Sequence, residues 1–238
     1  MFKIDELIIS KIADFTKNNV KIENYKLDPE FYYQSLPFCV IDSVYSIGVK
    51  YEIVKKTVKN FCEYNNLTVF RKNIDSIPEK ESQFSVTNFI DMFGKSDFDE
   101  LANSVFKNRQ RTSSKNGILK AEAVVHFLRE LSNEGINYFQ DLENISTSFD
   151  AKIQQIRGQK SGISLQYFYM LAGNDRLIKP DRMVIRYIEN IIKTSVSQKD
   201  CQSILEQTSL KLEDSGIYIS PRELDNAIWN YQRDIKQP

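Results

Sequence analysis

Apolar residues recur at helical spacing along most of the chain, and this period constrains the fold more than any other feature of the sequence. In the first segment Ile8, Ile12 and Phe15 follow the i, i+4, i+7 pattern of one helix face. Stripes of the same kind occur at residues 51–62, 124–131, 183–192, 201–212 and 224–231. Strand-like alternation is scarce, and residues 67–71 are the best candidate for a strand. The sequence therefore predicts an all-α protein of about ten helices.

Start signals support two of these helices. Ser220, Pro221 and Glu223 form a capping box with proline at the first helical position. Ser197 and Asp200 have the same serine-to-acid spacing. Both patterns predict a helix that begins directly after the serine.

Length and composition exclude several classes of protein. The 238 residues suffice for one or two domains, and they include one histidine (His126) and three cysteines. These counts exclude a histidine-rich metal site, an iron–sulfur cluster and a disulfide framework, and they favour a reducing compartment. The first residues resemble no targeting signal, and no apolar run approaches the length of a membrane span. We expect a cytoplasmic protein with no membrane contact, no metal and no cofactor.

The positive charges are clustered although the chain has no net charge. Lys plus Arg number 32, as do Asp plus Glu. Residues 101–121 nevertheless hold five basic residues and no acid, and residues 151–190 hold seven basic and three acidic residues. Such local charge favours a nucleic-acid partner, and the alternative is that each run is a solvated helix face.

Residues 148–172 predict two helices joined by a tight polar turn. A short helix over 148–156 is followed by Arg157-Gly158-Gln159-Lys160-Ser161-Gly162, and 163–172 is apolar nearly all round. Backbone N–H groups at such a turn, flanked by Arg157 and Lys160, form a site suited to a DNA phosphate. Asp181 follows where the next helix begins. Taken alone, Asp181 is also a good helix N-cap.

This order of helix, hairpin, buried helix, loop, aspartate and helix resembles the helix-hairpin-helix superfamily of DNA glycosylases. That superfamily includes endonuclease III and the alkyladenine and oxoguanine enzymes. Its hairpins read roughly Leu-Pro-Gly-Val-Gly-Arg-Lys-Thr-Ala, and residues 154–162 align with Gly158 on the second glycine and Ile156 in place of the first. Lys160 then falls on the Schiff-base lysine of the bifunctional members, and Asp181 on the essential aspartate. Residues 36–50 and 114–121 resemble two further helices of the superfamily.

The resemblance implies roles for individual residues. Asp181 would stabilise the oxocarbenium-like sugar and activate water, and Lys160 would either contact phosphate or attack the sugar. The hairpin would bind the DNA backbone through Arg157, Gly158, Gln159, Lys160, Ser161 and Gly162. Residues implied as a DNA wedge or as base-pocket contacts are Asp42, Gly48, Val49 and Lys50. For Asp42 the alternative is a surface or locally bonded aspartate.

The resemblance also implies an architecture and an activity. Residues 36–176 would form a lobe with the helix-hairpin-helix motif, residues 1–35 and 177–238 a second lobe, and a cleft would lie between them. We expect a monomeric, cofactor-free DNA glycosylase that flips a damaged or modified base out of duplex DNA, in repair or in defence against modified phage DNA. The alternatives are a non-catalytic helix-hairpin-helix DNA-binding protein and an α-helical protein-interaction scaffold.

Overall fold

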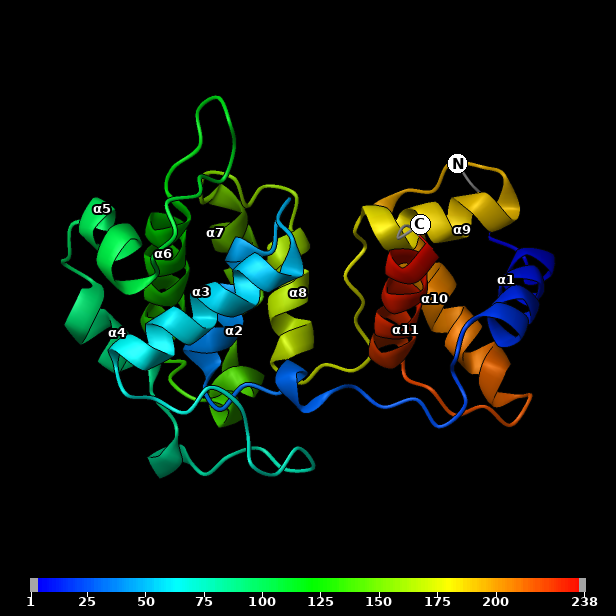
Figure 1. The fold of residues 1–238 in the computed structure, drawn as a ribbon, viewed down its shortest axis with the longest axis horizontal. Coiled ribbons are helices and arrows are strands. Elements are labelled where there is room, and N and C mark those ends of the chain that lie inside the picture. The colour runs from blue at the N-terminus through cyan, green and yellow to red at the C-terminus, as the bar shows by residue number, and fades with distance from the viewer. Residues whose placement is uncertain (1–3, 236–238) are drawn as a thin grey trace. The chain divides into compact units, whose positions relative to one another are not determined.

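Residues 4–235, which a computed structural model describes, are helical throughout, apart from turns and loops (Figure 1). Within these residues no β-strand forms. Phe70, in the 67–71 segment that was the best candidate for a strand, makes only an isolated bridge with Tyr33. The predicted all-α class is therefore confirmed.

The chain divides into two compact units. Unit 1 comprises residues 1–27 and 173–238, and unit 2 comprises residues 28–172. The lobes implied by the resemblance break the chain at residues 35 and 176 instead. The helix-turn-helix segment thus belongs to unit 2, and Asp181 belongs to unit 1.

Unit 1 is built from the amphipathic helices that carry the predicted stripes. They are α1 (Glu6–Asn19), α9 (Arg182–Ile192), α10 (Gln198–Glu213) and α11 (Pro221–Ile235). α1 packs on α9 and α10, and α11 packs on the same two helices. The stripe residues meet in one core that includes Ile12, Ile188, Ile204 and Ile228. Burial of these stripes is what stabilises the unit.

Unit 2 surrounds one fully buried helix. Its α-helices are α2 (Leu36–Tyr45), α3 (Tyr51–Tyr64), α4 (Val86–Phe93), α5 (Phe98–Glu100), α6 (Lys120–Asn133), α7 (Phe149–Gln155) and α8 (Ile163–Leu171). Short 3₁₀ turns lie at Pro29–Phe31, Lys80–Ser82 and Phe139–Asn144, and a π-helical turn lies at Leu101–Val105. Every residue of α2 is buried, and α2 packs against α3, α6 and α8. A helix that is apolar nearly all round requires such a position.

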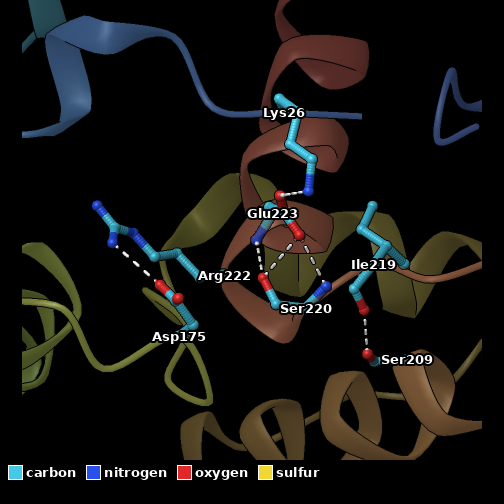
Figure 2. A network of polar contacts seen from close by, with 7 residues as sticks. All are labelled: Lys26, Asp175, Ser209, Ile219, Ser220, Arg222 and Glu223. Atoms are coloured by element: carbon cyan, nitrogen blue, oxygen red, sulfur yellow. Dashed lines mark hydrogen bonds and ion pairs between the residues drawn. The ribbon is translucent and has the colours of Figure 1, made fainter. Parts of the chain in front are cut away.

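Both predicted helix starts are confirmed. In Figure 2 the Ser220 hydroxyl accepts from the Glu223 N–H at 3.2 Å, and the Glu223 carboxylate accepts from the Ser220 N–H at 3.0 Å. The Ser197 hydroxyl accepts from the Asp200 N–H at 3.1 Å. α11 and α10 begin directly after these serines, since each serine satisfies an N–H group that the helix itself leaves free.

Candidate functional site

The turn between α7 and α8 is held by two short-range hydrogen bonds. The Gln159 N–H donates to the Ile156 carbonyl at 2.9 Å, and the Gly162 N–H donates to the Gln159 carbonyl at 3.0 Å. Gly158 and Gly162 have φ of +92° and +74°, in the left-handed region that favours glycine. The two glycines of the predicted hairpin are therefore required by its backbone.

Gly158 is also required because Thr112 packs directly against it. A Cβ atom at this position would lie 2.3 Å from Cβ of Thr112, in the loop that precedes α6. No side chain fits at that distance. The glycine thus lets the α7–α8 turn pack directly on the 110–119 loop.

The turn presents cations and free amides to solvent. Arg157, Lys160 and Ser161 are exposed, and neither cation forms an ion pair with any residue in 4–235. The N–H groups of Gly158, Lys160 and Ser161 donate no hydrogen bond within the same residues. Exposed N–H donors beside two cations suit an anion. Gln159 differs, because its side chain is 2% exposed and accepts a hydrogen bond from Ser164 inside the turn.

Two other turns of unit 2 are linked to the surface around the α7–α8 turn. Lys120, at the start of α6, donates from Nζ to the carbonyls of Tyr45 at 2.9 Å and Ile47 at 2.8 Å, so it holds the turn that contains Gly48, Val49 and Lys50. The Lys120 N–H donates to the Gln110 carbonyl at 2.8 Å, which fastens the 110–119 loop to the same helix start. Figure 1 shows this loop beside α7. We call the three turns the basic end; its exposed cations are Lys50, Arg111, Lys115, Arg157 and Lys160.

Three cations of the predicted basic run, Lys107, Arg109 and Lys120, do not belong to the basic end. Lys120 is 2% exposed, because its ammonium group binds the carbonyl of Tyr45, the last residue of α2, and that of Ile47 in the turn that follows. Arg109, from the same run, is paired with Asp99. Lys120 therefore adds no positive charge to the exposed surface, although it belongs to the basic run.

Asp42 and the predicted wedge residues differ in accessibility. Asp42 is 1% exposed, and its carboxylate accepts from the Tyr33 hydroxyl at 2.8 Å and from the Ser46 hydroxyl at 2.7 Å. This geometry matches the alternative of a locally bonded aspartate. Burial and the Asp42 charge together raise the pKa of Tyr33 well above its ordinary value. Gly48 and Lys50 are exposed, with Val49 partly so.

Asp181 is the N-cap of α9. Its Oδ1 accepts from the N–H groups of Met183 at 2.7 Å and Val184 at 3.2 Å. The residue is half-buried, and Oδ2 accepts no hydrogen bond within residues 4–235. The capping alternative is thus confirmed, and the second oxygen is left for another role.

Asp225 on α11 is a second carboxyl group near Asp181 that the sequence reasoning missed. It is 5% exposed, and its Oδ1 has no hydrogen-bond partner within residues 4–235. Burial and then the charge of Asp181 raise its pKa well above the ordinary value. The available signal was its position, since an acid three residues before Ile228 lies on the same face of the helix as that buried residue.

The same end of α11 holds the segment that leaves α8. Figure 2 shows the Arg222 guanidinium directed at Asp175, where Nη1 lies 3.1 Å from Oδ1. The Arg222 N–H also donates to the Asp175 carbonyl at 3.1 Å. Because Arg222 is 2% exposed, this clamp fixes the start of the segment that leads to Asp181.

Fold and site define an all-helical protein of two units, with an exposed glycine turn in one and a helix-capping aspartate, Asp181, in the other. The chain belongs to the family described as "Domain of unknown function (DUF8548)", whose family model matches residues 10–233. Comparisons with curated proteins and with solved structures gave no match. Within residues 4–235 no helix has the length and apolar character to cross a bilayer, and no three acidic, histidine or cysteine side chains are grouped as metal ligands.

Proposed function

We propose that the protein is a DNA glycosylase, in which unit 2 binds duplex DNA through the basic end and unit 1 supplies Asp181 for cleavage of the N-glycosidic bond. The observation that carries the proposal is the α7–α8 turn, where the N–H groups of Gly158, Lys160 and Ser161 donate no hydrogen bond within residues 4–235 and adjoin the exposed cations Arg157 and Lys160. The cleft predicted between the lobes stays a prediction.

The binding half of the proposal follows from the chemistry of the turn. Backbone N–H groups contact phosphate oxygens without reading base sequence, and neighbouring cations add salt-dependent attraction. Gly48 and Lys50 lie on a turn fastened to the same surface by Lys120. We assign Gly48 and Lys50 to the part of the basic end that would act as the DNA wedge.

The catalytic half follows from Oδ2 of Asp181, which accepts no hydrogen bond within residues 4–235. Departure of the base leaves positive charge on the sugar, and a carboxylate beside it stabilises that charge. The same carboxylate can accept a proton from the attacking water. A metal is not needed for either task.

Removal of both cations of the α7–α8 turn should weaken DNA binding. For Arg157→Ala/Lys160→Ala we expect about a tenfold increase in Kd for a 20-base-pair duplex at 0.1 M salt. The slope of log K against log salt should fall by about two, since two counterions fewer are displaced. Fluorescence anisotropy across a salt series measures both quantities.

Lys95 supplies the matched control, because it is an exposed lysine of unit 2 that lies between α4 and α5. Lys95→Ala should leave affinity and slope at the parent values. Equal effects of the control and the double variant would show that binding does not depend on the turn.

Lys160 also allows a test for strand cleavage through a Schiff base. Its side chain is exposed, whereas a nucleophilic lysine is usually desolvated or placed beside another cation to hold it neutral. We therefore assign it to phosphate contact and expect borohydride to trap no protein–DNA adduct. A trapped adduct that Lys160→Ala abolishes would make the enzyme bifunctional.

A non-catalytic DNA-binding protein is the second candidate, because every binding feature described above belongs to unit 2 alone. That function needs the basic end and leaves Asp181 as a helix cap only. It predicts duplex binding with the same salt slope and no base release from any substrate.

A further inference from the structure

A pocket lies in unit 2 beside the start of α2, and no part of the basic end contributes to it. Its volume is about 500 Å³, which is within the range of small-ligand sites in proteins. Its walls come from residues 34–38 and from the segment 66–84 between α3 and α4. In Figure 1 that segment and the 110–119 loop lie at opposite ends of unit 2. The pocket is therefore separate from the proposed DNA-binding surface.

Hydrogen bonds to the residues that begin α2 hold one wall of the pocket in place. Nε2 of Gln34 donates to the carbonyl and to the hydroxyl of Ser82, each at 3.1 Å. The Ser35 hydroxyl accepts from the Phe84 N–H at 2.8 Å. Because this wall is fixed before a ligand arrives, binding does not have to order it.

The charged side chains that line the pocket are all cations. They are Arg71 and Lys72. Arg71 is anchored, since its Nε donates to the Tyr33 carbonyl at 2.9 Å and its Cζ lies 4.6 Å from the centroid of the Phe139 ring. Lys72 is exposed and forms no ion pair within residues 4–235. The acids of the same segment line no part of the pocket: Asp75, Glu79 and Glu81. A negatively charged ligand would therefore meet two cations and no acid in the lining.

Backbone N–H groups and hydroxyl groups adjoin the two cations. The N–H groups of Lys72, Asn73 and Ser76 donate no hydrogen bond within residues 4–235. The hydroxyls of Thr68 and Ser76 make none within the same residues. Successive backbone N–H groups beside cations suit the oxygens of a phosphate group. We therefore match the anion to phosphate.

The lining also includes an aromatic surface. Phe84, Leu67 and Pro78 line the pocket and are each partly exposed. The Phe84 ring stacks on the fully buried Phe38, with 6.5 Å between the ring centroids and 16° between the ring planes. A partly exposed ring that is held by a buried one offers a fixed surface on which a nucleic-acid base can stack.

We propose that this pocket binds a nucleoside phosphate, with the phosphate group at Lys72 and the neighbouring N–H groups and with the base against Phe84. A free mononucleotide and the terminal nucleotide of a DNA strand share this chemistry. The inference goes beyond the proposed function and does not depend on it, because no lining residue belongs to the basic end or to unit 1.

Isothermal titration calorimetry with the four nucleoside 5′-monophosphates tests the site. At least one of them should bind, whereas its nucleoside and inorganic phosphate should each bind at least about tenfold more weakly, because each lacks one of the two contacts. Absence of binding by all four, or binding of either half as tight as that of the nucleotide, would overturn the proposal. Displacement of the mononucleotide by a short 5′-phosphorylated oligodeoxynucleotide would assign the site to strand ends, and failure to displace it would assign the site to free nucleotides.

Two substitutions locate the bound nucleotide. Lys72→Glu places a negative charge beside the phosphate group and should weaken nucleotide binding at least about tenfold. Phe84→Leu keeps an apolar side chain but removes the flat ring, so it should weaken nucleotide binding about tenfold and leave the affinity for inorganic phosphate unchanged. Urea unfolding checks that Phe84→Leu is folded, and the exposed position of Lys72 keeps the first substitution independent of the core.

Lys95→Glu is the matched control, since Lys95 is an exposed lysine of unit 2 that does not line the pocket. It should bind the nucleotide with the parent affinity. Equal losses for Lys95→Glu and Lys72→Glu would overturn the proposal, because the effect would then be one of overall charge. Loss of nucleotide binding in Arg157→Ala/Lys160→Ala, with Lys72→Glu at the parent affinity, would place the nucleotide on the basic end and would also overturn it.

Discussion

Asp181→Asn should reduce base release about 10³-fold while the protein remains folded and bound to DNA. The amide carries no charge to stabilise the sugar and is a poor acceptor for the proton of water. Its oxygen still accepts the N–H groups of Met183 and Val184, and asparagine and aspartate are equivalent N-caps. We therefore expect the free energy of unfolding to change by no more than about 0.5 kcal/mol.

Asp181→Ala separates the two roles of this residue. It removes the cap as well as the carboxylate, so it should cost about 1 kcal/mol of stability in addition to activity. Single-turnover base release and urea unfolding on both variants measure the two effects. If Asn retained the parent rate and Ala lost it, Asp181 would act only as a cap.

Gly158→Ala should destabilise the protein by about 4 kcal/mol. Alanine is strained at a φ of +92°, and its Cβ would overlap Cβ of Thr112. Both costs fall on the contact between the α7–α8 turn and the 110–119 loop, so DNA affinity should be lost with it. Urea unfolding followed by circular dichroism gives the stability change.

Gly135→Ala is a control that introduces backbone strain without steric overlap. Gly135 lies in unit 2 with a φ of +75°, and a Cβ there would meet nothing within 4 Å. Gly135→Ala should therefore cost only about 1 to 2 kcal/mol. Adding Thr112→Gly to Gly158→Ala should recover part of the loss, and no recovery would exclude the Thr112 contact as its cause.

The helices were predictable because each buries one stripe of side chains. The stripes around Ile12, Ile188 and Ile228 lie in the core of unit 1, as their spacing requires. The capping serines were equally readable, since their hydrogen bonds are local in sequence. Interactions within one helical turn need no knowledge of the rest of the fold.

The features that were missed depend on residues far apart in the sequence. Lys120 faces inward because the carbonyls of Tyr45 and Ile47 lie beside it, and no local pattern contains that contact. Asp225 becomes buried only after α9, α10 and α11 have packed. The close contact of Gly158 with Thr112 likewise joins two loops that periodicity does not place.

The most direct test of the account is release of free base from duplex DNA, measured by mass spectrometry over alkylated, oxidised, deaminated and mismatched substrates and over modified phage DNA. The account predicts that the parent protein liberates at least one base and leaves an abasic site, and that Asp181→Asn liberates none above background. Tight, salt-dependent binding by the parent without release of any base would contradict it.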